Sequence, residues 1–112
     1  MKPETLDFYH KVYAVVAEIP HGKVTSYGAI SEYLGVKSGA RMVGYALNNY
    51  DSEELGFHIP AHRVLNRLGQ LTGRAFFDGN SMQERLVQEE IEFVEEFTVN
   101  MKKHFWNPID EL

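Results

Sequence analysis

The residues with the most distinctive chemistry lie in the segment 60–64, which reads Pro-Ala-His-Arg-Val. Ala61, next to His62, carries only a methyl group and cannot act as a nucleophile. The whole chain contains no cysteine, which excludes disulfides, a thiol nucleophile and a zinc–thiolate site. His10 and His58 show no ligand spacing with a third partner, so we expect no metal. The sequence therefore excludes thiol chemistry.

A second group of residues is suited to contacts with nucleic acid. Arg41 stands near the start of an expected helix, and its planar, cationic guanidinium can stack on bases or bind phosphate. A phosphate contact or a solvated surface charge is the simpler interpretation. Ala40 and Gly44 lie four residues apart on one helix face, which permits close approach to a groove or tight helix packing. Tyr27 is expected to be a half-buried core residue, because its phenol has apolar faces and a polar tip.

Helices are expected to position these residues. Apolar residues recur at helical spacing between Phe8 and Ile19 and predict a helix over residues 4–18, which the Pro-His-Gly-Lys turn ends. A shorter helix is predicted over residues 27–34, stopped by Gly35.

The short link after Gly35 favours a helix-turn-helix, since such a unit joins two helices by a brief turn that contains glycine. Ser38 is expected to cap the second helix, residues 40–48.

Two short strands are expected after the helix pair. Residues 59–66 are typical of a strand or strand edge that Pro60 interrupts early. Residues 68–71 (Leu-Gly-Gln-Leu) resemble a hairpin turn leading into a second strand. Together these two segments predict a β wing beside the helix pair.

The C-terminal third begins with a helix that Asn80 or Ser81 caps and that runs to about Glu90. Residues 91–99 fit either an alternating strand or an extension of this helix. Residues 104–108, which include the only tryptophan, are expected to dock on the domain.

Length and charge limit the possible functions. The chain of 112 residues with 44% apolar side chains predicts one compact domain over residues 1–112. Its net charge of −5 argues weakly against nucleic-acid binding. However, residues 81–112 hold eight acidic and three basic side chains, whereas residues 1–80 are balanced. A locally positive DNA-facing surface remains possible, with a small footprint. No leader or membrane span is evident, so a soluble cytoplasmic protein is expected.

Three motifs in order resemble the O6-alkylguanine-DNA alkyltransferase family. Residues 19–28 are similar to its approach to the helix pair, residues 40–44 (Ala-Arg-Met-Val-Gly) to the opening of its recognition helix, and residues 60–64 to its active-site motif. Ala61 stands where the enzymes have the cysteine that accepts the alkyl group. The chain therefore resembles the alkyltransferase-like proteins, which bind alkylated guanine without repairing it.

The resemblance implies a mainly α fold with a small β wing, a winged helix-turn-helix that binds double-stranded DNA through the minor groove. It implies no cofactor, a monomer, O6-alkylguanine rotated into a pocket, and hand-over to nucleotide excision repair proteins. The residues that it implies for DNA and lesion binding are Tyr27, Ala40, Arg41, Gly44, Ala61, Val64 and Arg74.

Several roles follow only from the resemblance. Arg41 would fill the place of the rotated base, Tyr27 would press on the 3′ phosphate, and Arg74 would lie in a loop over the guanine ring. His62 and Glu89 would be a structural remnant of the pair that activates the thiol, although Glu90 is an alternative partner. Arg63 is expected to brace the fold.

Three other functions remain open at this point. One is a winged-helix transcription regulator that binds undamaged DNA. Another is an enzyme, either a residual alkyltransferase or a hydrolase that uses His62 and Glu89. The third is an interaction domain whose acidic C-terminal third binds a partner. One departure also stands out: the family's enzymes have an asparagine before a proline after the recognition helix, and residues 47–51 (Leu-Asn-Asn-Tyr-Asp) lack that proline.

Overall fold

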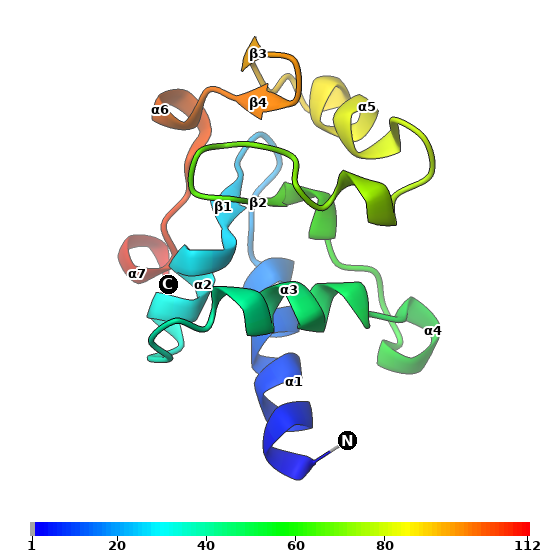
Figure 1. Ribbon diagram of the computed structural model, residues 1–112, viewed down its shortest axis with the longest axis vertical. Coiled ribbons are helices and arrows are strands. Elements are labelled where there is room, and N and C mark those ends of the chain that lie inside the picture. Colours follow the sequence, from blue (N-terminus) through cyan, green and yellow to red (C-terminus); the bar gives the residue numbers. More distant parts are fainter. Residues whose placement is uncertain (1) are drawn as a thin grey trace.

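The computed structural model describes residues 2–112 and contains two apolar clusters. The first lies between α1 (Pro3–Ala17), α2 (Tyr27–Tyr33) and α3 (Ala40–Asn48). The second lies beneath α5 (Ser81–Gln88) and the β hairpin. Figure 1 shows these as a lower and an upper half, joined by the central strands β1 and β2. The mainly helical fold class is confirmed.

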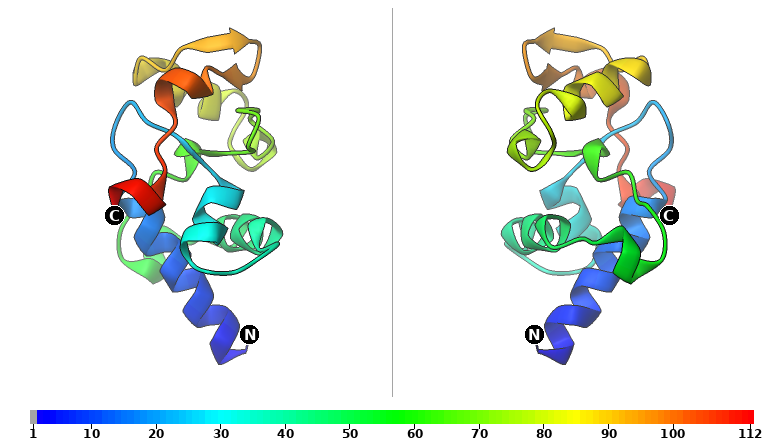
Figure 2. Two further views of the ribbon diagram at one scale, coloured as in Figure 1. Left: turned by 90° about the vertical axis from the view of Figure 1, so that its left-hand side faces the viewer. Right: turned by 90° about the vertical axis from the view of Figure 1, so that its right-hand side faces the viewer.

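The N-terminal helix matches its prediction, because its apolar stripe becomes the floor of the first cluster. Val12, Val16 and Ile19 are buried on that stripe or just after it, and Pro3 occupies the first turn, where a missing N–H costs nothing. The helix runs down to the N-terminal end of the molecule, away from the upper half (Figures 1 and 2).

Helices α2 and α3 form the predicted pair. Ser26 caps α2 by accepting a hydrogen bond from the Ala29 N–H at 3.0 Å. The prediction that Ser38 caps α3 is wrong: Gly39 occupies the cap position and no side chain accepts a hydrogen bond there. Ser38 instead adopts a left-handed conformation, with φ 56°. Gly39 fits because any Cβ there would clash with Ser31 and Val36.

The β structure differs from the prediction. The strand expected over residues 59–66 is limited to β2 (Val64–Leu65), which pairs in parallel with β1 (Thr25–Ser26). Residues before it form a 3₁₀ turn, η1 (Ala61–Arg63), since Pro60 has no N–H to offer a sheet.

The hairpin lies elsewhere than expected. It consists of β3 (Phe93–Glu95) and β4 (Thr98–Val99), which pair antiparallel. Residues 91–99 therefore form strands and do not extend the preceding helix. Residues 66–70 form a tight turn held by Asn66 Oδ1, which accepts from the N–H groups of Leu68 and Gln70. This turn joins the edge of the hairpin, because the Val99 N–H donates to the Gly69 carbonyl at 2.8 Å.

The C-terminal segment docks as predicted. Trp106 is buried, and its backbone N–H donates to the Val24 carbonyl at 2.7 Å. The backbone N–H of Val24 in turn donates to the His104 carbonyl at 3.0 Å. The remaining short elements are α4 (Ser52–Leu55), η2 (Arg74–Phe76), α6 (Met101–His104) and α7 (Pro108–Glu111). Helix α7 packs against α2 (Figures 1 and 2).

Helix α5 ends in a Schellman motif. The Ile91 N–H donates to the Leu86 carbonyl and the Glu90 N–H to the Val87 carbonyl, both at 3.0 Å. This motif places Glu90 in the left-handed region, with φ 63°. The residue that usually occupies such a position is glycine.

Candidate functional site

A pocket of about 630 Å³ lies where the two halves of the molecule meet. This volume is within the range of roughly 300–1,000 Å³ that is usual for small-ligand sites. Segments distant in sequence build it: the start of α2, the end of α3, η1, η2 and α5. The lining residues are Ala17, Tyr27, Leu47, Asn48, Tyr50, His58, Ile59, Pro60, Ala61, His62, Arg63, Val64, Gly73, Phe76, Phe77, Met82 and Arg85.

The segment 60–64 supplies one continuous wall of this pocket. Ala61 is half-buried and lines the pocket. Because its side chain is a single methyl group, it fills little of the pocket. Val64 is fully buried next to it and offers an apolar surface. The structure thus brings together three of the residues expected at the lesion: Tyr27, Ala61 and Val64.

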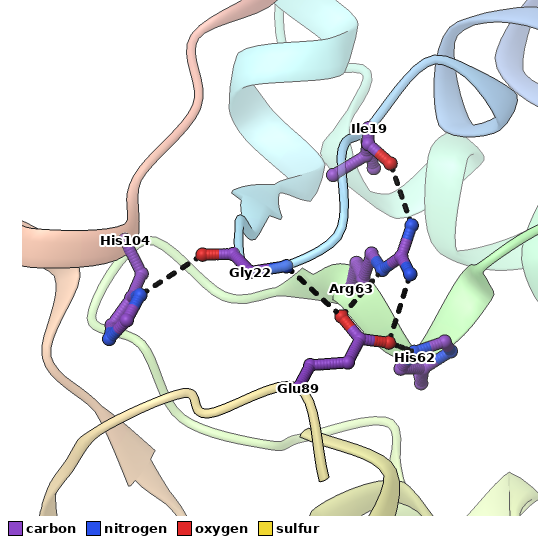
Figure 3. A network of polar contacts seen from close by, with 6 residues as sticks. All are labelled: Ile19, Gly22, His62, Arg63, Glu89 and His104. Atoms are coloured by element: carbon purple, nitrogen blue, oxygen red, sulfur yellow. Dashed lines mark hydrogen bonds and ion pairs between the residues drawn. The ribbon is translucent and has the colours of Figure 1, made fainter. Parts of the chain in front are cut away.

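Behind this wall, the Glu89 carboxylate receives hydrogen bonds from several groups (Figure 3). Arg63 donates from Nε to Oε1 at 2.8 Å and from Nη2 to Oε2 at 3.0 Å. The Nε2 atom of His62 lies 2.6 Å from Oε2. The Gly22 N–H donates to Oε1 at 3.4 Å. Glu89, and not Glu90, is therefore the partner of His62.

Arg63 also ties this cluster to the N-terminal helix. Its Nη1 donates to the Ile19 carbonyl at 2.7 Å, so one guanidinium joins η1, the loop after α1 and the end of α5 (Figure 3). His104 adds a further link, since its Nδ1 lies 3.1 Å from the Gly22 carbonyl. This geometry supports the expectation that Arg63 braces the fold.

The network fixes the charge state of its members. Burial alone would raise the pKa of Glu89, but the hydrogen bonds from Arg63 and His62 outweigh it and lower the pKa to about 2. Burial lowers the pKa of His62 below its usual 6.5, against the opposing effect of Glu89. Because Glu89 is ionised, His62 donates from Nε2, and its buried Nδ1 has no partner within residues 2–112.

Tyr27 contacts the opposite side of the pocket at its Gly73 edge. A Cβ on Gly73 would come within 2.8 Å of the Tyr27 hydroxyl, so glycine lets the phenol lie against this loop without displacement. Burial raises the pKa of Tyr27 above 10.0, with an opposing hydrogen bond from Thr72. The phenol therefore stays protonated at neutral pH and can donate a hydrogen bond.

Arg74 does not line the pocket in this structure, contrary to the expected placement. Its guanidinium stacks on the Phe97 ring at 4.2 Å and donates to the Leu71 carbonyl at 3.3 Å. The cation–π contact with the β hairpin draws the side chain away from the cavity. The neighbouring Phe76 lines the pocket instead and is 67% exposed.

Tyr50 is a site residue that the sequence did not reveal. Its hydroxyl donates to the Phe57 carbonyl at 3.0 Å and accepts from the Ile59 N–H at 2.9 Å. These two bonds close the loop that leads into the segment 60–64. The only sign of this role in the sequence was a tyrosine shortly after the end of α3.

Helix α3 presents the other expected residues to solvent. Arg41 is exposed and forms neither a salt bridge nor a side-chain hydrogen bond with any residue in the range 2–112. A Cβ added to Gly44 would meet no atom within 4 Å. Packing within the protein therefore does not require glycine there, which favours close approach of a partner. Ala40 begins the same helix and is also exposed.

Two further properties concern residues 2–112. No group of three or more histidine, aspartate or glutamate side chains is arranged to hold a metal ion. No helix combines the length and apolar character needed to cross a membrane.

Comparisons with known proteins show the family to which the chain belongs. Residues 7–92 match the family model of the 6-O-methylguanine DNA methyltransferase DNA-binding domain. Alkyltransferase-like protein 1 of Schizosaccharomyces pombe is 39% identical over 107 residues, covering 91% of this chain and 96% of that protein. The DNA base-flipping protein of Vibrio parahaemolyticus is 35% identical over 103 residues, covering 90% and 97%.

A solved structure extends the likeness to three dimensions. The crystal structure of S. pombe Atl1 in complex with damaged DNA containing O6-carboxymethylguanine superposes with a TM-score of 0.75 at 36% identity, covering 95% of this chain and 98% of that one. Without cysteine, this chain has no thiol that could accept an alkyl group. The chain belongs to the DNA-binding-domain family of 6-O-methylguanine DNA methyltransferases, as an alkyltransferase-like member in which Ala61 replaces the acceptor cysteine.

Proposed function

We propose that this protein binds double-stranded DNA through α3 in the minor groove and rotates O6-alkylguanine into the pocket beside Ala61. The observation that carries the proposal is an intact pocket wall around a position that has no nucleophile. The Glu89 network holds His62 and Arg63 in place, while Ala61 leaves space where a thiol would react. The related Atl1 structure contains DNA with an O6-alkylated guanine.

The exposed residues of α3 suit the DNA contact. Arg41 has no side-chain partner within residues 2–112, so its guanidinium can enter the base stack and offset part of the few kcal/mol that unpairing a base costs. Ala40 and Gly44 allow the helix backbone to approach the groove closely. Tyr27 presses the adjacent phosphate into rotation from the edge of the pocket.

Arg74 would contribute only after leaving Phe97. A loop residue held by one cation–π contact and one hydrogen bond can exchange these for a contact with the guanine ring.

Because no covalent bond forms, the complex is reversible and ends by dissociation or by hand-over. We propose that the monomeric protein marks the lesion for nucleotide excision repair proteins. The β hairpin and α6, which belong to the acidic C-terminal third, lie in the upper half of the molecule away from α3 (Figure 1), so they stay free of the DNA phosphates.

A titration tests the proposal. One duplex is prepared with guanine or O6-methylguanine at a single site, and binding is measured by fluorescence anisotropy at a stated salt concentration. We expect tighter binding to the modified duplex and an unchanged protein mass after incubation. Equal affinity for the two duplexes would contradict the proposal and favour a winged-helix regulator of undamaged DNA.

A further inference from the structure

The pocket carries no acidic side chain in its lining, although the protein as a whole has a net charge of −5. The basic groups that line it are His58, His62, Arg63 and Arg85. An acidic protein that keeps all carboxylates out of one cavity presents there an environment that favours an anion.

Two of these basic groups already have a carboxylate partner. Arg63 and His62 both contact the Glu89 carboxylate, within 3.0 Å and 2.6 Å respectively. Arg85 differs from them, since its guanidinium forms no salt bridge or side-chain hydrogen bond with any residue in the described part of the chain. Its one aromatic contact within residues 2–112 is the Phe77 ring, whose centroid lies 5.8 Å from the Arg85 Cζ atom.

Arg85 lines the same pocket as Ala61. Helix α5 packs against η1, and Met82 and Arg85, which lie one turn apart on α5, both line the pocket. Glu89, four residues after Arg85, contacts His62, the residue next to Ala61. The charge of Arg85 also acts on His62, where it adds to the effect of burial in lowering the pKa.

We infer that Arg85 makes this pocket select O6-alkylguanines whose alkyl group ends in a carboxylate. This inference rests on the proposed function and names the class of adduct that the same pocket prefers. A neutral adduct gains only apolar contacts beside Ala61 and Pro60. A carboxylate that loses water there needs a cation, and an unpaired guanidinium can bind it with two parallel hydrogen bonds.

A pair of nearly isosteric adducts tests this inference. Duplexes carry O6-carboxymethylguanine or its neutral counterpart, O6-(carbamoylmethyl)guanine, and an O6-methylguanine duplex reports on lesion binding itself. For the unaltered protein we expect roughly five-fold or greater preference for the carboxylate, reduced as salt is raised. The ratio of the two dissociation constants removes the contribution of phosphate contacts, which both duplexes share.

Three variants locate the effect. Arg85→Gln should abolish the preference, and Arg85→Lys should retain part of it because the charge remains without the planar fork. Arg67→Gln removes an exposed arginine outside the pocket and should leave the ratio unchanged. Circular dichroism establishes that each variant is folded, and the ratio for the unaltered protein tests the preference independently of them.

Two results would overturn the inference. Equal affinity of the unaltered protein for the two isosteres would show that the pocket ignores the carboxylate. Equal weakening of all three duplexes by Arg85→Gln would assign Arg85 to a DNA phosphate instead. Neither result affects the O6-methylguanine preference, whose absence would remove the proposed function and this inference together.

Discussion

Two regions of the molecule differ in how their polar side chains are paired. On the inner wall (His62, Arg63 and Glu89) the side chains are only 10–16% exposed and bind one another. On the proposed DNA-facing side (Arg41 and Arg85), Arg41 is exposed and unpaired within residues 2–112, and the partner of Arg85 there is the Phe77 ring. Groups that satisfy each other stabilise the fold, whereas unpaired cations are available to a ligand.

The side chains of His62 and Glu89 have a structural role that needs no nucleophile. Glu89 joins three parts of the chain, through Gly22, His62 and Arg63. Loss of the nucleophile removes none of these contacts, so the pair retains a structural role. Changes to the inner wall should therefore affect stability, and changes to the DNA-facing side should affect binding.

Glu89→Ala should have the largest effect. It leaves Arg63 and His62 unpaired in a mostly buried setting, which is expected to cost roughly 3–5 kcal/mol of unfolding free energy. Urea denaturation followed by circular dichroism measures this loss. Glu92→Ala is the matched control, because Glu92 pairs with Lys103 at the surface and its removal should change little. Similar losses in both variants would contradict the structural role of the inner wall.

Acidification should weaken the same wall. The pKa of Glu89 is about 2 in the folded protein against 4.5 ordinarily, so its contribution is complete above pH 4.5 and disappears as the pH falls through 2. The pKa of His62 lies below 6.5, so protonation there also favours the unfolded chain as the pH falls below 6.5. We expect unfolding free energy to decrease from pH 7 to pH 3. Glu89→Gln should flatten the part below pH 4.5, and an unchanged slope would argue against the lowered pKa.

Arg41→Ala should weaken binding to an O6-methylguanine duplex by roughly 1–3 kcal/mol, the range for losing one stacking or base contact. Its unfolding free energy should stay the same, because the side chain has no partner within residues 2–112. Lys11→Ala removes the same charge from the exposed side of α1 and provides the control for anisotropy titrations. Equal affinities of the Arg41 variant and the unaltered protein would exclude the intercalating role.

Tyr50→Phe tests a residue that should affect both the stability of the fold and the binding of the lesion. Losing the two hydrogen bonds that close the loop should reduce stability by about 1–2 kcal/mol. The preference for O6-methylguanine should decrease while affinity for the unmodified duplex is kept, since the loop shapes only the pocket. Tyr33→Phe, at an exposed tyrosine of α2, should alter neither property. A Tyr50 variant with unaltered stability would show that the loop closes without its hydroxyl.

Glu90→Gly should give the smallest effect, a gain of up to about 1 kcal/mol. Glycine adopts the left-handed conformation at φ 63° without steric cost, although its greater freedom when unfolded offsets part of the gain. Thermal unfolding measures the change, and Glu90→Ala should show no comparable gain. Because Glu90 lies outside the His62 contact, lesion binding should not change.

The local predictions that succeeded rest on short-range physics. The helices over residues 4–18, 27–34 and 40–48 follow from apolar periodicity and glycine stops, and each appears with small shifts at its ends. The prediction that Ser38 caps the helix was wrong because the cap position is one residue later, at Gly39. Gly39 packs too closely against Ser31 to carry a side chain that could cap the helix. The strand over residues 59–66 failed because Pro60 and the η1 turn leave only two residues for pairing.

The sequence by itself determined the family, the absence of a thiol nucleophile and the helix pair, because residue identity and short-range periodicity are sufficient for these. Only the tertiary structure decided that Glu89 is the partner of His62, that Tyr50 closes the loop and that Arg74 rests on Phe97. Each of these contacts joins residues that no local sequence pattern relates to each other. They form because packing of the two apolar clusters brings their elements together.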